Sequence, residues 1–199
     1  MTEPLRLGIM GGTFDPIHLG HLIAASEAHA RFSLDRVLFL PAACPWQKSG
    51  YSDAEDRFLM TSFAAAGHRG FEVSRLEIDR RGPTYTSETL QTLSEHHGDS
   101  QLFLILGADA AAGLRTWHEP QRLLELATLL VPGRVGAQKI PDDIPHETLE
   151  MPVIDISSTE IRNRVRAGRP IEFLVPPGVA IHIRTAGLYT GTPMEVPHA

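Results

Sequence analysis

Short apolar segments recur along the chain, and polar or helix-periodic segments separate them. Four of these segments are nearly continuous apolar runs of strand length: residues 5–10, 36–40, 101–106 and 128–131. Such runs are typical of strands buried on both faces of a parallel sheet. Small and apolar residues then recur at helical spacing between the first two runs, at Leu19, Leu22, Ile23, Ser26 and Ala30. A strand, a helix and a second strand in this order predict a right-handed parallel unit and an α/β fold.

Two further strands complete the expected sheet. Residues 71–79 alternate apolar and polar side chains, which predicts a strand with one solvated face, and residues 80–83 end it. Residues 151–156 are predicted to form the last strand. The polar, proline-containing residues 136–147 before it are expected to form a mobile surface loop.

Start signals mark the remaining helices. Ser52 and Glu55 have the spacing of a capping box, which predicts a helix start. The apolar side of that helix is expected to consist of Phe58, Leu59, Phe63 and Ala66. Further helices are expected from the hydroxyl-rich residues 84–90, over the leucine-rich residues 121–127, and in a C-terminal helical segment near residues 175–184.

Glycines and histidines gather directly after the first strand, in residues 11–21, which read Gly-Gly-Thr-Phe-Asp-Pro-Ile-His-Leu-Gly-His. Glycine at the carboxyl end of a strand lets a phosphate or a purine approach the backbone without meeting a Cβ. His18 and His21 are three residues apart, so both imidazoles are expected on one helix face, which Gly20 keeps flat. Two imidazoles beside the free N–H groups of a helix N-terminus are suited to binding a polyphosphate.

A second group of phosphate-binding side chains follows the last expected strand, in residues 156–162. Ser157 and Glu160 again match a capping box, and a helix cap alone is one interpretation of them. Ser158, Thr159 and Arg162 add hydroxyl, backbone and guanidinium donors at the same helix N-terminus. These donors favour a second anion site.

Composition excludes several classes of protein. The chain has 199 residues, with 42% hydrophobic and 21% charged, which is typical of one soluble globular domain, here residues 1–190 with a frayed tail at 191–199. A net charge of −6 argues against a general nucleic-acid binder. The single cysteine, Cys44, excludes an internal disulfide and is expected to pack. The sequence lacks a signal region and an apolar run of the roughly 20 residues that span a membrane, so we expect a cytoplasmic protein without membrane contact.

Residues 11–21 and 156–162 together resemble the two signatures of the nucleotidyltransferase superfamily with the His-x-Gly-His motif. The resemblance covers nearly the whole chain and is closest to the bacterial nicotinate-nucleotide adenylyltransferases. It implies a Rossmann-like parallel sheet with helices on both faces. It also implies an enzyme of NAD biosynthesis that transfers AMP from ATP to nicotinate mononucleotide, giving deamido-NAD and pyrophosphate.

The resemblance assigns catalytic roles to four residues. His18 and His21 are expected to donate to the ATP phosphates, with His18 nearest the α-phosphate. Arg162 is expected to hold the β- and γ-phosphates. Lys48 is expected to neutralise charge between the two substrates, although a solvated surface lysine is an equal alternative. Its segment reads Pro45-Trp46-Gln47-Lys48, where the family usually has Pro-x-His-Lys.

Two further groups of residues are implied to contact the substrates. The ATP group is Gly11, Gly12, Thr13, Phe14, Gly20, Gly107, Asp109, Ile156, Ser157, Ser158 and Thr159. The nicotinate mononucleotide group is Trp46, Tyr85, Thr86, Trp117 and His118, with Trp117 stacking on the pyridine. A helix cap at Asp109 and a core position for Trp117 are the alternatives. The preference for the acid over the amide rests on the resemblance.

The implied partners are ATP and nicotinate mononucleotide. The sequence leaves open whether the protein forms a homo-oligomer. No carboxylate cluster in the sequence has metal-ligand spacing, so Mg²⁺ is expected to arrive on ATP, held by phosphate oxygens and water. A sibling transferase that acts on pantetheine phosphate or uses CTP is the first alternative. A non-catalytic nucleotide sensor is the second. The spacing of Gly8, Gly11 and Gly12 does not match the dinucleotide fingerprint of dehydrogenases.

Overall fold

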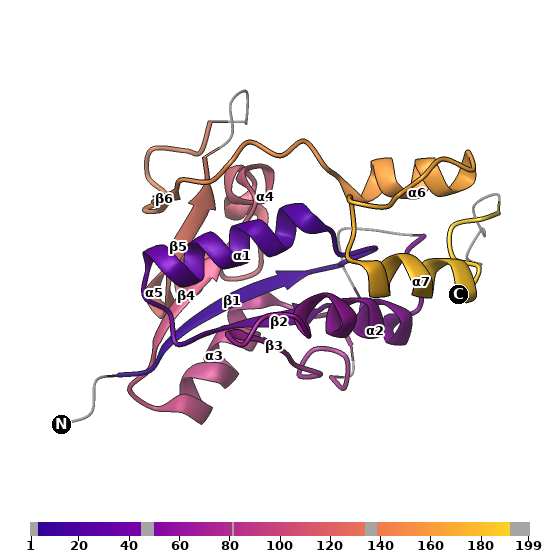
Figure 1. The fold of residues 1–199 in the computed structure, drawn as a ribbon. Coiled ribbons are helices and arrows are strands. Elements are labelled where there is room, and N and C mark those ends of the chain that lie inside the picture. Colours follow the sequence, from indigo (N-terminus) through magenta and orange to yellow (C-terminus); the bar gives the residue numbers. More distant parts are fainter. Residues whose placement is uncertain (1–3, 45–49, 81, 134–138, 192–199) are drawn as a thin grey trace.

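A six-stranded sheet forms the centre of the computed structural model, which describes residues 4–44, 50–80, 82–133 and 139–191. The strand order is β3-β2-β1-β4-β5-β6, and each neighbouring pair of these strands is parallel (Figure 1). The strands are β1 (Arg6–Gly12), β2 (Arg36–Pro41), β3 (Phe71–Val73), β4 (Gln101–Ile105), β5 (Ala127–Pro132) and β6 (Glu147–Leu149). The predicted α/β class with a parallel sheet is therefore confirmed.

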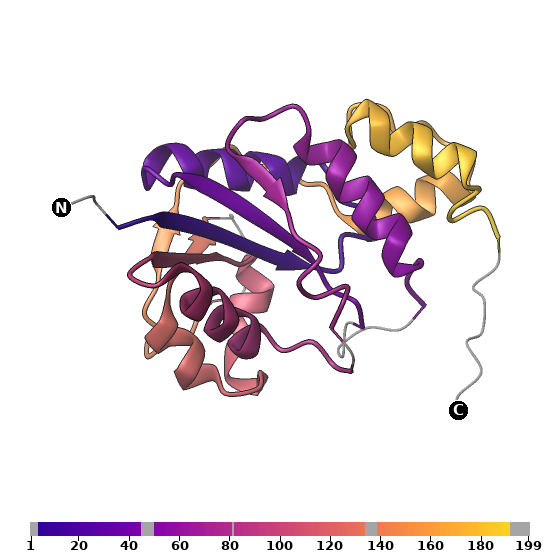
Figure 2. The ribbon, with the colours of Figure 1, turned by 90° about the horizontal axis from the view of Figure 1, so that it is seen from below.

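Helices cover both faces of this sheet, as predicted. They are α1 (Leu19–Arg31), α2 (Ala54–Ala65), α3 (Thr86–His97), α4 (Ala108–Ala112), α5 (Pro120–Leu126), α6 (Ser158–Arg166) and α7 (Pro177–Thr185), with a 3₁₀ turn, η1 (Leu114–Thr116). Figure 2 shows α1 on one side of the sheet and α3 on the other. The helices α6 and α7 form the expected C-terminal helical segment, and α7 packs against α2. No helix among these elements has the length and apolar character needed to cross a membrane.

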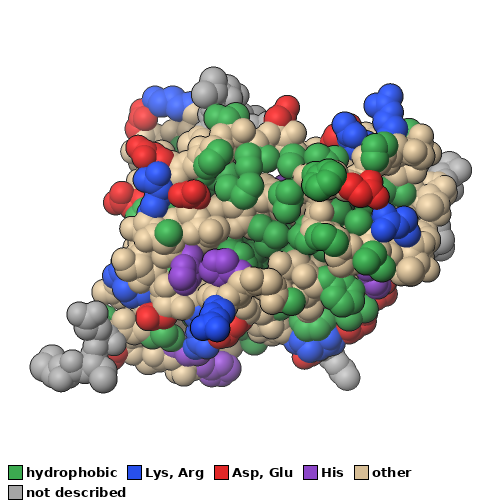
Figure 3. Space-filling view, viewed as in Figure 1, with side chains coloured by type: hydrophobic (Ala, Val, Ile, Leu, Met, Phe, Trp, Pro, Cys, Tyr) green, Lys and Arg blue, Asp and Glu red, His purple; other side chains and the backbone are tan. Residues whose placement is uncertain are grey.

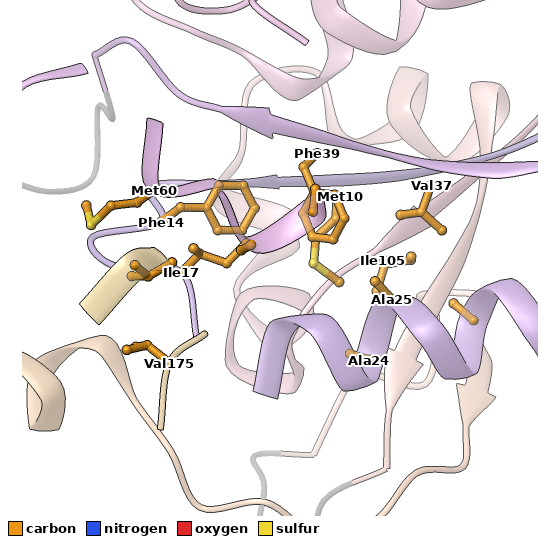
Figure 4. Packing of buried hydrophobic residues seen from close by; sticks show 14 of the residues in the cluster. Met10, Phe14, Ile17, Ala24, Ala25, Val37, Phe39, Met60, Ile105 and Val175 are labelled. Carbon is orange, nitrogen blue, oxygen red and sulfur yellow. The ribbon is translucent and has the colours of Figure 1, made fainter. Parts of the chain in front are cut away.

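Strand alternation divides the core into two halves. Val37 and Phe39 of β2 belong to the cluster on the α1 face, whereas Leu38 and Leu40 belong to the cluster on the α3 face. Figure 4 shows the α1 face, where Phe14 and Ile17 of the glycine–histidine segment lie among core side chains. Ile17 is fully buried. Burial of these apolar side chains fixes the segment that carries the histidines onto the core.

Two of the predicted strands differ from the structure, one in its length and the other in its position. The strand expected over residues 71–79 ends at Val73, and turns follow it. The Ser74 hydroxyl accepts a hydrogen bond from the Leu76 N–H, which offers the backbone an alternative to the ladder. Residues 151–156 form no strand, and the edge strand is instead β6, which begins inside the segment that we expected to be a loop.

The predicted apolar side of α2 is also wrong in part. Asp53 rather than Ser52 caps α2, and its carboxylate accepts from the Glu55 N–H. Leu59 and Phe63 of the predicted apolar side are 40% and 46% exposed. The buried positions of α2 are Arg57, Met60, Thr61, Ala64 and Ala65.

Small side chains face the sheet in α1. Ala24, Ala25 and Ala28 are its buried residues, whereas Ala30 is exposed. Alanine lets a helix approach a sheet closely, and the predicted helix itself is confirmed. Cys44 was expected to pack, but it is exposed. The expected tail from residue 191 lies outside the described residues except for Gly191 itself.

Candidate active site

A cavity of about 1050 Å³ lies at the carboxyl ends of the central strands. The chain leaves β1 toward β2 through α1, and later returns to pair β4 with the other edge of β1. This reversal of strand order opens a crevice where open α/β sheets bind their ligands. Gly11 and Gly12 at the end of β1 and Gly107 after β4 line the cavity.

The two histidines lie at the N-terminus of α1, but only one belongs to the helix. His18 is the N-cap residue with extended backbone angles, and His21 is the third helical residue. The Nδ1 atom of His21 accepts a hydrogen bond from the His18 N–H at 3.2 Å. The rings stack with their centroids 3.7 Å apart. The expectation that both rings project from one face of a helix is therefore corrected, although the rings do lie together and line the cavity.

Burial controls the charge of His18. Its residue is 7% exposed, and desolvation by burial lowers its pKa to about 4. Its Nδ1 atom is buried and has no hydrogen-bond partner among the described residues. A Cβ on Gly20 would stand only 3.1 Å from that atom, so a side chain there would press on the His18 ring. His18 is thus a neutral imidazole at pH 7, at the edge of a cavity.

The second motif, residues 156–162, contacts the first motif, residues 11–21, beside the cavity. Ser157 caps α6 by accepting from the Glu160 N–H, which confirms the predicted helix start. The Ser158 hydroxyl donates to the Pro16 carbonyl at 2.9 Å. Arg162 donates from Nη1 to the Asp15 carbonyl at 2.7 Å and from Nη2 to the Thr159 hydroxyl at 3.2 Å. These contacts hold Arg162 at the cavity that the histidines line.

The structure brings every residue of the expected ATP group to this one cavity. Gly11, Gly12, Thr13, Phe14, Gly20, Gly107, Asp109, Ile156, Ser157, Ser158 and Thr159 all line it. A Cβ on Gly11 would meet nothing within 4 Å, because it would extend into the open space. Asp109 lies in the first turn of α4 and is exposed.

The expected acceptor group is only partly assembled. Thr86 and Trp117 line the cavity, and Trp117 is half-buried. Tyr85 and His118 are not among the residues that line it, and their expected contact with the acceptor stays a prediction. Their rings stack on one another at 4.2 Å, so they join the start of α3 to the segment that carries Trp117. Trp46 and Lys48 lie outside the described residues.

Sequence reasoning missed three features of the site. Arg57 is fully buried and donates to the carbonyls of Thr13, Ala42, Ala43 and Ser52. Glu77 is 5% exposed, lines the cavity and accepts from the Thr89 hydroxyl, and its burial raises its pKa to about 7. A buried arginine and a buried glutamate are rare, and only contacts between distant segments explain them.

The third missed feature is the segment that was expected to be a strand. Met151, Pro152, Val153 and Ile154 line the cavity, and Val153 is 65% exposed. Figure 3 shows hydrophobic side chains gathered where this segment runs between β6 and α6. Its apolar pattern was visible in the sequence. Apolar side chains at the mouth of a cavity are typical of ligand sites rather than of a sheet interior.

Known proteins resemble this chain over most of its length. The model of the cytidylyltransferase-like family matches residues 9–164. A probable nicotinate-nucleotide adenylyltransferase of Saccharopolyspora erythraea is 47% identical over 96% of this chain and 92% of its own. One of Corynebacterium kroppenstedtii is 50% identical over 92% of this chain and 90% of its own.

Solved structures share the fold. The Plasmodium falciparum nicotinic acid mononucleotide adenylyltransferase complexed with NaAD matches with a TM-score of 0.80 at 21% identity, over 93% of this chain and 97% of that one. A structure described as a putative nicotinate-nucleotide adenylyltransferase from Vibrio parahaemolyticus matches with a TM-score of 0.72 at 20% identity, over 95% of this chain and 98% of that one. The Rossmann-like architecture is therefore confirmed. By sequence, the chain belongs to the cytidylyltransferase-like family and, within it, to the nicotinate-nucleotide adenylyltransferases.

Proposed function

We propose that this protein transfers AMP from ATP to nicotinate mononucleotide, producing deamido-NAD and pyrophosphate in NAD biosynthesis. The observation that carries the proposal is the convergence of His18, His21 and Arg162 on one cavity. Two helix N-termini, those of α1 and α6, lie at this same cavity, and the positive end of a helix dipole favours an anion. The names of the bacterial relatives support nicotinate mononucleotide as the acceptor.

The reaction needs little covalent chemistry from the protein. An oxygen of the acceptor 5′-phosphate attacks the α-phosphorus of ATP, and a new P–O bond forms. The bond between the α-phosphorus and its bridging oxygen breaks, and its electron pair leaves with pyrophosphate. The acceptor phosphate is already a nucleophile, so the protein must align two anions and stabilise the charge that develops between them.

Each donor in the cavity suits one part of that task. His18 donates to the α-phosphate with His21 beside it, and Arg162 with Ser158 and Thr159 holds the departing β- and γ-phosphates. The guanidinium is planar, so it can bind two phosphate oxygens at once. Lys48 remains our proposal, from the sequence alone, for the cation between the acceptor and donor phosphates.

The acceptor base is proposed to lie against Trp117 and Thr86. An aromatic ring at a cavity surface offers a face on which a pyridine can stack. Tyr85 precedes Thr86, and His118 follows Trp117, so the stacked rings of Tyr85 and His118 fix the spacing of the two lining residues. We therefore assign Tyr85 and His118 a supporting role. Trp46 stays a prediction from the sequence.

Magnesium is proposed to enter with ATP. Among the described residues, no group of three or more His, Cys, Asp or Glu side chains is arranged to hold a metal ion. Mg²⁺ keeps much of its water in nucleotide sites and binds phosphate oxygens directly. When bound, it would reduce the negative charge of the triphosphate, while the donors of this chain position the phosphates.

A substrate panel tests the proposal. The purified protein is incubated with Mg²⁺, with ATP or CTP, and with nicotinate mononucleotide, its amide or pantetheine phosphate. We expect pyrophosphate with ATP and nicotinate mononucleotide, and a product with the mass of deamido-NAD. Arg162→Ala serves as the matched negative control. Turnover with pantetheine phosphate alone, or with CTP alone, would assign a sibling transferase, and binding of ATP without any turnover would indicate a nucleotide sensor.

A further inference from the structure

Three side chains from the C-terminal part of the chain converge on Asp15 and Pro16. The Ser158 hydroxyl donates to the Pro16 carbonyl, and Arg162 donates to the Asp15 carbonyl. The third is Tyr189, beyond the end of α7, whose hydroxyl donates to Oδ1 of Asp15 at 2.7 Å. The C-terminal residues thus bind the same turn that leads into His18.

The carboxylate of Asp15 lies between a phenol and a guanidinium. Asp15 is 5% exposed, so its side chain needs partners inside the protein. Tyr189 provides the shortest contact, whereas the Ser52 N–H is 3.4 Å from Oδ1. Nη1 of Arg162 stands 3.9 Å from Oδ2, which is too long for a hydrogen bond. Arg162 binds the Asp15 backbone instead and leaves the carboxylate to the phenol.

Two features of Tyr189 indicate that its position is enforced. Its backbone has a φ of 65°, in the left-handed region that aromatic residues rarely adopt. Burial, together with the charge of Asp15, raises the pKa of its hydroxyl above the ordinary value. The phenol is therefore a neutral donor at every working pH. Tyr189 does not line the cavity, although both Asp15 and Arg162 do.

We propose that Tyr189 is a positioning residue for the triphosphate: its hydroxyl holds the Asp15 carboxylate off Arg162, so that the guanidinium stays available to the β- and γ-phosphates. A carboxylate and a phosphate compete for the same guanidinium donors. Without the phenol, the buried carboxylate turns to Arg162 as its nearest remaining charged partner. This inference rests on the proposed function only in taking ATP as the ligand.

The test compares ATP with AMP in the Tyr189→Phe variant, which removes one oxygen atom. Loss of a hydrogen bond to a charged group is expected to weaken ATP binding about tenfold. AMP lacks the phosphates that Arg162 is proposed to hold, so its affinity should stay within about twofold by the same reasoning. Titration calorimetry with Mg-ATP and AMP, without acceptor, measures both. A role in folding alone would weaken both ligands equally, and that result would overturn the proposal.

Two controls sharpen this comparison. Ile183→Val opens a small cavity in the buried side of α7 and lowers the melting temperature, but leaves the partners of Asp15 in place. Its ATP affinity should match that of the unaltered protein. In an Arg162→Ala background, Tyr189→Phe should have no further effect on ATP affinity. If Tyr189→Phe still lowered ATP affinity tenfold in that background, Tyr189 would not act through Arg162.

The outcomes separate this inference from the proposed function. If the unaltered protein makes deamido-NAD and Tyr189→Phe binds ATP normally, only the role of Tyr189 is wrong. If Tyr189→Phe loses affinity for ATP but not for AMP, and no pyridine nucleotide is ever adenylylated, the role of Tyr189 stands and the proposed acceptor is wrong.

Discussion

The imidazoles of His18 and His21 stack with their planes inclined by 29° and their centroids 3.7 Å apart, at the N-terminus of α1. Two protonated rings at this separation would repel each other, and the positive end of the helix dipole adds to the cost. Burial of His18 already favours its neutral form. His18 is therefore a neutral donor until a polyanion arrives and supplies the compensating charge.

Replacement of His18 by alanine should abolish most turnover without unfolding the protein. Loss of one preorganised donor to the reacting phosphate lowers kcat by about 100-fold or more. Initial rates of pyrophosphate release at saturating ATP measure this loss. His96→Ala, at an exposed position near the end of α3, is the matched control and should leave kcat unchanged. A kcat for His18→Ala near that of the control would refute the assigned role.

The pH dependence of stability should reveal the buried His18. Its folded pKa of about 4 lies below the 6.5 of an unfolded histidine, so the unfolded chain binds more protons between these values. The free energy of unfolding therefore falls as pH decreases from 6.5 to about 4, by on the order of 3 kcal/mol from this group. Urea unfolding of the protein and of His18→Gln, compared at pH 7.5 and 4.5, isolates that contribution. If acidification lowered the free energy of unfolding equally in both proteins, the account of a neutral, buried His18 would be contradicted.

Glu77 should act in the opposite sense. Its folded pKa of about 7 lies above the usual glutamate value of 4.5, so the folded protein binds more protons between pH 4.5 and 7. The free energy of unfolding then falls as pH rises through this window, by on the order of 3 kcal/mol from this group. Glu77→Gln should therefore be more stable than the unaltered protein at pH 8 and similar to it at pH 4.5. Glu125, an exposed residue that forms an ion pair with Arg122, provides the control. Glu125→Gln should not show this gain in stability at pH 8.

Alanine at Gly11 should separate binding from folding. The new Cβ meets no atom within 4 Å and points into the cavity, so the melting temperature should not change. The methyl group would occupy space that the nucleotide needs, and ATP affinity should fall about tenfold or more. Gly67→Ala, also without a neighbour within 4 Å but remote from the cavity, is the control. Unaltered ATP affinity in Gly11→Ala would place the nucleotide elsewhere.

Local signals predicted the central part of this molecule. The apolar runs of β1, β2, β4 and β5 and the histidine spacing depend on near neighbours in the sequence, so they were recognisable. The edge strand β6 was missed because three residues carry little periodicity, and pairing with β5 defines them. Pro152 lacks an N–H for a ladder, which helps to explain why the apolar segment after β6 borders the cavity instead.

Contacts between distant segments were beyond sequence reasoning. Arg57 looks like a surface residue of an amphipathic helix, yet it is buried because carbonyls of three segments converge on its guanidinium. Tyr189 meets Asp15 only because α7 packs on α2 beside the glycine–histidine segment. Neither contact has a spacing that a single sequence displays. The side chains that we propose to bind the phosphates were predictable, whereas the buried residues that position those side chains were not.

The central claim is that one triphosphate lies between two distant motifs. A crystal structure with a non-hydrolysable ATP analogue tests it most directly. We predict that the α-phosphate lies within hydrogen-bond distance of His18 and that the β- and γ-phosphates contact the Arg162 guanidinium. A triphosphate that contacts neither side chain, with Arg162 paired to Asp15 instead, would contradict the account.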